Sequence, residues 1–306
     1  MTTAAAPGPA TDTVESPGAL PATKPRGMFL RGLEVFVENK LAIVGVVLLV
    51  LIFAFCFLGP LFYHGNTTSS DLLSTDLGPG SGHPLGTTNQ GFDELALLMK
   101  GGQAALEVGF FAAAIGIVVG AIYGSIAGLA GGLLDSAMMR VVDIFLSIPF
   151  LFIVLIVAVR YGASVIGLSL IIGAFIWLAP ARLVRGEVLS LKVRDFVQAA
   201  RCAGAGRWRL INRHLLPNAL SVIIVNVTFN IADAILAVSY LGFLGFGLHY
   251  PNLDWGDMVS NGTSYMLDGY WWLIYPVGFC IVATVMACNF IGDALRDALD
   301  VRLRRR

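Results

Sequence analysis

Long apolar runs alternate with shorter polar segments along this chain. A bilayer core about 30 Å thick needs roughly 20 apolar residues in a helix, and six stretches reach that length. We expect each of them to cross a membrane as one helix. The predicted spans are 41–62, 104–130, 141–160, 165–183, 218–245 and 270–291. The pattern therefore predicts an all-α, polytopic membrane protein with six transmembrane helices.

The composition supports this class and excludes a soluble domain. The chain of 306 residues is 57% hydrophobic and 13% charged, with a mean hydropathy of +0.78. A soluble protein of this length could not keep so much apolar surface from water. The four cysteines show no metal-binding or redox spacing, and Cys56, Cys280 and Cys288 fall inside apolar runs, where cysteine acts as a small hydrophobic residue.

The positive charges are segregated, which predicts the orientation. Of the 20 Lys and Arg residues, 18 fall in the N-terminal tail, at Arg140, in the segment 182–217 or near the C-terminus. Only Lys100 and Arg160 fall on the opposite side. Positive loops stay in the cytoplasm. Both termini and the segment 182–217 are therefore predicted to be cytoplasmic.

A row of glycines in the second span repeats every four residues, at Gly116, Gly120, Gly124 and Gly128. Residues at this spacing share one helix face, and small residues there let two helix backbones approach closely. The alternative is general plasticity of a glycine-rich span.

The basic segment 182–217 is the long charged stretch between spans. Good helix formers at 196–203, glycines at 204 and 206, and a second helical start at Trp208 predict two short helices at an angle. Pro217 is expected to end the second helix and begin the next span. The alternative is a plain positive anchor on the membrane surface. The expected apolar side of this unit comprises Val197, Ala200, Trp208, Ile211 and Leu215.

The layout of this segment resembles the EAA loop of permeases from ABC importers. It contains Gln198-Ala199-Ala200, then Gly204, then His214-Leu215-Leu216-Pro217. Further blocks at 83–87, 243–247, 254–258 and 292–300 are similar to the dipeptide/oligopeptide/nickel permeases, and the closest resemblance is to their C-type membrane subunit. Gln198 stands where the family usually has Glu, and Thr88 and Val238 also depart from its pattern.

The resemblance implies a transport subunit that is not an enzyme. It needs no cofactor of its own, and ATP and Mg would bind to separate ATPase subunits. The chain agrees, because it has no phosphate-binding loop. The implied partners are a second permease, two ATP-binding subunits, an extracytoplasmic substrate-binding protein, a short peptide and the lipid of a bacterial plasma (inner) membrane, with no nucleic acid. The alternatives are import of nickel or another small solute, or a self-contained channel or secondary transporter.

The implied organisation has three parts. Residues 1–27, rich in Pro, Ala, Thr and Gly, form a disordered cytoplasmic tail. Residues 28–103 hold the first span and the first outer segment, and residues 104–306 hold a five-helix core with the coupling loop at 184–217. The expected ATPase-coupling residues are Gln198, Ala199, Ala200, Arg201, Gly204, Arg207, His214, Leu216 and Pro217.

Polar residues inside the fifth span mark a candidate substrate path. Asn226, Asn230 and Asp233 share one helix face, and polar groups in lipid are costly, so this face should turn inward. It would either line the path or join two helices. Arg140 and Asp143 are expected to form an ion pair, and the isolated His83 and His249 are weak grounds for a metal site.

Overall fold

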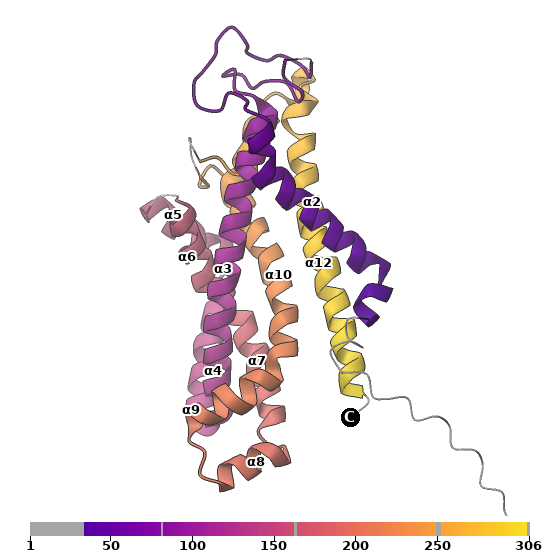
Figure 1. Cartoon of the computed structure of the whole chain (residues 1–306). Helices are drawn as coiled ribbons and strands as arrows, with labels where there is room; N and C mark the ends of the chain where they lie inside the picture. Colours follow the sequence, from indigo (N-terminus) through magenta and orange to yellow (C-terminus); the bar gives the residue numbers. More distant parts are fainter. Residues whose placement is uncertain (1–33, 81, 162–163, 249–251, 305–306) are drawn as a thin grey trace, which may run out of the picture.

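The computed structural model describes residues 34–304 except 81, 162–163 and 249–251. The predicted disordered tail 1–27 and His249 lie outside this part of the chain. Its extended regular elements are helices. The helices are α2 (Lys40–Phe62), α3 (Glu94–Ala130), α4 (Gly132–Ser147), α5 (Phe150–Tyr161), α6 (Val165–Ile176), α7 (Leu178–Leu191), α8 (Asp195–Cys202), α9 (Arg207–Leu210), α10 (Leu216–Phe243), α11 (Trp255–Thr263) and α12 (Tyr275–Arg304). Figure 1 shows their course together with the long loop that follows α2.

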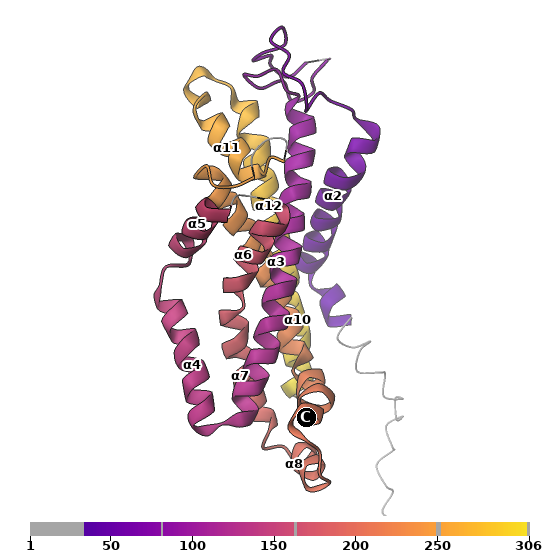
Figure 2. The same cartoon turned by 90° about the vertical axis from the view of Figure 1, so that its left-hand side faces the viewer.

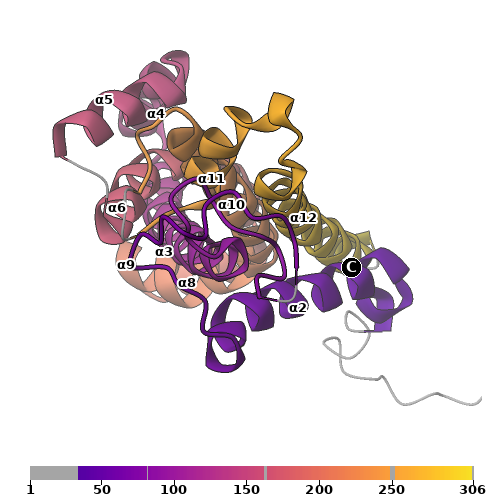
Figure 3. The same ribbon diagram turned by 90° about the horizontal axis from the view of Figure 1, so that it is seen from above.

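Four continuous helical stretches in the described residues are long and apolar enough to cross a membrane, and there are up to six spans if two bent helix pairs count as one each. The all-helical membrane fold is thus confirmed. Helix α3 lies at the centre and packs against α6, α7 and α10, while α12 packs against α2 and α10. Seen from above in Figure 3, α4 and α5 lie at one edge of the molecule, and α2 and α12 lie at another.

Helix α3 begins ten residues before the predicted span at 104, so that boundary was wrong. The cause is Asp93, whose side chain caps the helix by accepting a hydrogen bond from Ala96 N at 2.9 Å. The Leu- and Ala-rich residues that follow then continue the helix at low cost. As a result α3 is 37 residues long and extends beyond the predicted span at its N-terminal end.

The third predicted span is not one helix. It starts at Gly132 and divides into α4 and α5, whose axes differ by 80°. The break follows from Pro149, which lacks an N–H and pushes the residue before it out of the α region. Ile148 is accordingly extended, with φ −91° and ψ 130°.

The fourth predicted span is also bent, by 42°, between α6 and α7. The break lies four residues before Pro180, where the proline ring would meet the carbonyl of Ile176 in a straight helix. Helix α7 then continues to Leu191, so the first part of the predicted loop 184–217 is helical. The basic side chain of Arg185 in this part therefore projects from helix α7 and not from a loop.

The glycine row of α3 is a close helix contact, as predicted. A Cβ at Gly120 would lie 2.7 Å from Pro180 Cβ and 2.8 Å from Trp177 O, and one at Gly128 would lie 2.8 Å from Val188 Cγ1. These distances are too short for any side chain, so α7 packs directly on the bare backbone of α3.

The two ends of the molecule are formed by different connecting segments. In Figures 1 and 2 the long connection after α2 lies at one end, and α8 lies at the opposite end. Helix α11 lies near the first end and is held by Trp255, which is fully buried and donates from Nε1 to Leu98 O at 3.0 Å. The connection between α10 and α12 therefore contains a helix that is anchored to α3.

We predict that Gly124→Val destabilises the α3–α7 contact. The new Cβ would meet Arg185 N at 2.9 Å and the carbonyl oxygen of Ala181 still closer, and overpacking typically costs about 1–3 kcal/mol. The measurement is the midpoint of thermal unfolding in detergent. Gly186→Val is the matched control, since its Cβ meets nothing within 4 Å. Equal midpoints for the two variants would contradict the proposed role of the glycine row.

Candidate functional site

The segment between α7 and α10 forms a compact helical elbow, which we define as residues 192–217. Helix α8 ends in a Schellman motif: Gly204 N donates to Arg201 O at 3.0 Å, and Ala205 N donates to Ala200 O at 3.0 Å. This ending requires a left-handed residue, and Gly204 has φ +79°. The predicted bend at Gly204 is confirmed.

The elbow is fixed to the membrane helices by an apolar cluster. Val197 of α8 is fully buried and belongs to the same cluster as Val184 and Val188 of α7 and Ala121 of α3. Leu210, Ile211, Leu215 and Ala219 complete it from the helix that follows. Helices α8 and α7 therefore share one apolar cluster, and close-packed side chains of this kind can transmit displacement.

Trp208 does not join this cluster, so its predicted place on the apolar side was wrong. Its side chain is 60% exposed, and Phe196 is 43% exposed. Phe196 comes one residue before the buried Val197, and Trp208 comes two residues before the buried Leu210. Each residue turns a helix by about 100°, so these two side chains point away from the buried face. The elbow thus presents two aromatic residues outward, beside its basic residues.

The expected coupling residues fall into two groups in the structure. Those on α8, at the turn and at the start of α9 are exposed, apart from the half-buried Ala200. The exposed ones are Gln198, Ala199, Arg201, Gly204 and Arg207. Of the later group, His214 and Leu216 are half-buried and Pro217 is exposed. Gln198 is also used within the elbow, because its Nε2 donates to Lys192 O at 2.8 Å.

Pro217 does not interrupt the helix, contrary to the expectation that it ends one helix and starts another. A continuous helix runs from Arg207 to Phe243. Pro217 has no N–H to donate, and the helix accommodates it with a π-helical turn at Ile211–Leu215. In this turn Leu216 N donates to Ile211 O, five residues back. Such a turn relieves the clash between a proline ring and the carbonyl four residues earlier.

Two ion pairs join α4 to α7. Arg185 forms a bidentate pair with Asp135, with Nε–Oδ1 at 2.5 Å and Nη2–Oδ2 at 2.7 Å. Arg182 pairs with Asp143. The predicted pair between Arg140 and Asp143 was therefore wrong about the partner, because the packing of α4 on α7 brings Asp143 to an arginine 39 residues away. Lys192 adds a hydrogen bond to Gly128 O, at the end of α3, at 2.9 Å.

The three polar residues of the fifth span are separated by the structure. Asn230 and Asp233 line a cleft of about 670 Å³ beside the break at Pro149, together with Phe150 and Tyr240. Asn230 is 5% exposed, and its Nδ2 donates no hydrogen bond within the described residues. Asn226 lies instead beside a second hollow near Arg296, and its Nδ2 donates to Val222 O at 2.8 Å.

A polar network at the other end was not found by sequence reasoning. Asp93, 1% exposed, accepts hydrogen bonds from Tyr63 Oη at 2.6 Å and Ala96 N at 2.9 Å, and His83 Nδ1 lies 2.8 Å away. Burial and then Asp93 raise the pKa of Tyr63, so its phenol stays a donor at neutral pH. The available signal was an Asp directly before an apolar helical run. His83 is thus bound to a carboxylate, and no group of three metal-ligating side chains occurs among the described residues.

Two family models match this chain. Residues 116–305 match the binding-protein-dependent transport system inner membrane component, and residues 28–79 match the N-terminal TM domain of oligopeptide transport permease C. The chain belongs to the first of these families. It is therefore a multi-pass inner-membrane transport subunit, non-catalytic and without a cofactor. Its family works with a binding protein, a permease and ATPases, and the ATPases use the ATP.

Individual relatives cover nearly the whole chain. The dipeptide transport system permease protein DppC of Bacillus subtilis (strain 168) is 38% identical over 271 residues, which are 88% of this chain and 84% of the relative. The oligopeptide transport system permease proteins OppC of Bacillus subtilis (strain 168) and Escherichia coli (strain K12) are each 36% identical, over 88% of this chain and 88% and 89% of the relatives. The predicted resemblance to this permease type is confirmed.

We predict that Arg185→Met destabilises the protein more than Arg182→Met. Loss of Arg185 leaves Asp135, with a side chain only 10% exposed, without its cation, and an unsatisfied buried acceptor costs about 1–3 kcal/mol, more when charged. The Arg182–Asp143 pair is half-exposed, at 49% and 48%, and such pairs contribute about 0–1 kcal/mol. Thermal unfolding in detergent measures both, and adding Asp135→Asn should recover part of the loss in the Arg185 variant. A larger effect at Arg182 would contradict the ranking.

Proposed function

We propose that this chain is the C-type permease subunit of an ATP-driven importer of dipeptides and oligopeptides. The observation that carries the proposal is similarity over most of the chain to permeases of dipeptide and oligopeptide systems. The complete importer would contain a second permease, two ATP-binding subunits and an extracytoplasmic substrate-binding protein.

The proposed orientation places α8 and both termini in the cytoplasm. The elbow is basic, and positive segments stay on the cytoplasmic side. The same arginines keep the elbow out of the bilayer, since each would cost about 2.5–3.5 kcal/mol at the centre of a span. Helix α12 ends toward the α8 end of the molecule (Figure 1), which agrees with a C-terminus on that side.

The elbow is the proposed contact with the ATPase subunits. The expected coupling residues that are exposed on α8 and α9 are Gln198, Ala199, Arg201 and Arg207. The small side chain of Ala199 would let a groove on the partner approach the helix backbone, and the arginines would supply charged contacts at the rim. Coupling requires that this surface bind the two ATPase states with unequal affinity, because a ligand without such a difference shifts no equilibrium.

The path from the elbow to the cleft supports a transmission route. Val197 packs into the same cluster as Val188 of α7, and α7 holds α4 through the pair of Arg185 with Asp135. Helix α4 ends at the bend beside Pro149, which lines the cleft with Asn230 and Asp233. We propose that movement of α8 opens and closes this cleft, and that the second permease forms its other wall. Asn226 lies off this route.

We predict that Gly204→Val uncouples ATP hydrolysis from uptake. A β-branched residue at φ +79° is strained, so the Schellman ending and the presentation of α8 would change. The expected result is insertion at the normal level with uptake of labelled peptide reduced roughly tenfold or more, equivalent to about 1.4 kcal/mol of coupling energy. The measurement is ATP-dependent uptake by proteoliposomes of the complete importer.

Gly206→Val is the matched control for this experiment. Gly206 has φ −68°, which valine adopts easily, and a Cβ there meets nothing within 4 Å. It should retain near-normal uptake. Normal uptake by the Gly204 variant would remove the coupling role of the turn.

We predict that a membrane-impermeant maleimide labels Cys202 only after the cells are permeabilised. Cys202 lies exposed on α8, whereas Cys56, Cys280 and Cys288 are buried, so labelling reports on the elbow. Cys202→Ala should abolish the signal. Labelling of Cys202 in intact cells would contradict the proposed orientation.

A further inference from the structure

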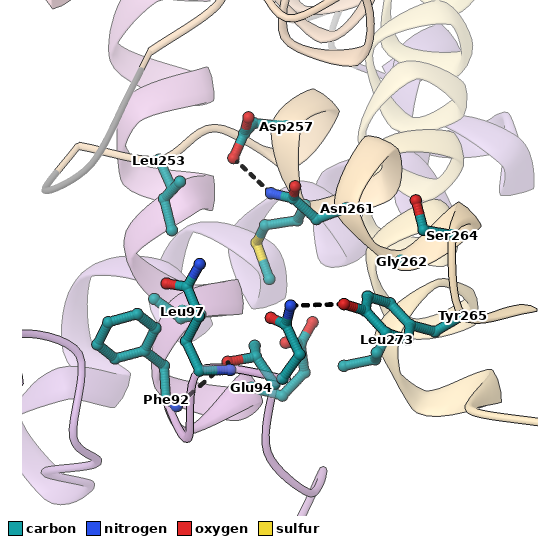
Figure 4. Close-up of a pocket in the computed structure, with 14 residues that line it drawn as sticks. Phe92, Glu94, Leu97, Leu253, Asp257, Asn261, Gly262, Ser264, Tyr265 and Leu273 are labelled. Atoms are coloured by element: carbon teal, nitrogen blue, oxygen red, sulfur yellow. Dashed lines mark hydrogen bonds between the residues drawn. The ribbon is translucent and has the colours of Figure 1, made fainter. Parts of the chain in front are cut away.

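A pocket of about 400 Å³ lies at the end of the molecule opposite the elbow. It is formed between the start of α3 with the residues before it, and α11 with the turns that follow (Figure 4). We call it the outer pocket. The proposed coupling elbow and the cleft at Pro149 use none of its residues. It is lined on one side by residues 88–97 and on the other by residues 253–273.

Glu94 is the unusual member of this lining. Its side chain is 2% exposed, and its Oε1 accepts no hydrogen bond from the described residues. The neighbouring Asp93 is equally buried but has partners in Tyr63, His83 and Ala96. The N-terminus of α3 favours a negative charge at this position, but it supplies no hydrogen bond to Oε1. Burying a carboxylate oxygen without a hydrogen-bond donor is costly, so Oε1 is suited to accept a hydrogen bond from a ligand.

The other polar residues of the outer pocket match a cationic ligand. Among the described residues, its lining contains two acids, Glu94 and Asp257, and no Lys, Arg or His. Phe92 and Tyr265 also face it, and aromatic rings attract ammonium groups. The surrounding amides are held in place: Asn261 Nδ2 donates to Asp257 Oδ2 at 2.9 Å, and Asn89 Nδ2 donates to Tyr265 Oη at 2.6 Å (Figure 4).

The size and the ligand set select among cations. The pocket volume falls in the usual range of small-molecule sites, about 300–1,000 Å³. It is larger than the volume that a single aliphatic side chain would fill. The described residues contain no group of three His, Cys, Asp or Glu that could hold a metal ion. The amide groups of Asn89, Gln90 and Asn261 offer donors and acceptors of the kind that pair with a peptide backbone.

We propose that the outer pocket binds the terminal ammonium group of an incoming peptide through Glu94. The ammonium would donate to Oε1 of Glu94, Asp257 would add negative charge at the rim, and the amides would contact the first peptide group. The inference rests on the proposed peptide-import function and deepens it. It assigns this subunit a recognition site for the free amino terminus, separate from the cleft at Pro149.

The test uses the importer complex in lipid nanodiscs without its binding protein. Equilibrium dialysis measures the Kd for radiolabelled alanyl-alanine and for its N-acetyl derivative. The wild-type complex should bind the free dipeptide on the order of 10- to 100-fold more tightly, the range expected for loss of a charge-assisted hydrogen bond. Glu94→Gln should remove this preference. Asp268→Asn is the control, because Asp268 is an exposed acid of the same outer segment that does not line the pocket.

Three results would overturn the inference. One is equal binding of the two ligands by the wild-type complex, which needs no variant to fold. Another is an unchanged preference in Glu94→Gln. The third is a Glu94→Gln complex that keeps its peptide affinity but loses affinity for the binding protein, which would assign the pocket to a basic side chain of that protein. A wild-type importer that takes up peptide in any of these cases retains the proposed function, whereas absence of any ATP-dependent peptide uptake would reject the function itself.

Discussion

The arrangement of this subunit depends on the contact between the bare backbone of α3 and helix α7. Gly120, Gly124 and Gly128 of α3 lack the side chains that would hold the two helices apart, so the backbone of α7 approaches closely, while Gly116 faces Ile176 at the end of α6. Small residues allow such packing in a membrane, where dispersion and polar contacts replace the hydrophobic effect between helices. This contact sets the rotation of α7, so that Arg185 faces Asp135 while Val188 faces the elbow.

Helix α3 also joins the two functional regions. Its first residue, Glu94, lies in the outer pocket, and the carbonyl of Gly128 near its end accepts a hydrogen bond from Lys192 at the start of the elbow. A single rigid element thus extends from the proposed recognition site to the proposed ATPase contact. Helices α4, α6 and α7 pack against it.

Most of the fold was predictable because apolar length alone decides where a chain can cross a membrane. The bend at Pro149 was not predicted, since hydropathy is insensitive to the direction of a helix, although the proline itself was visible. The partner of Asp143 was missed for a different reason: the nearest arginine in sequence is Arg140, but tertiary packing supplies Arg182. The turn at Gly204 was predictable from local chemistry, whereas the buried state of Glu94 depends on the packing of α11 against the start of α3.

The π-helical turn at Ile211–Leu215 has a consequence for the evolution of this subunit. A turn of this kind corresponds to one inserted residue in an α-helix, and one residue rotates all that follows by about 100°. The side of α10 that carries Asn230 and Asp233 is therefore set by a register change about four helical turns away, next to Pro217. Gain or loss of a single residue at that place would turn a different stripe of α10 toward the cleft, without any substitution in the stripe itself.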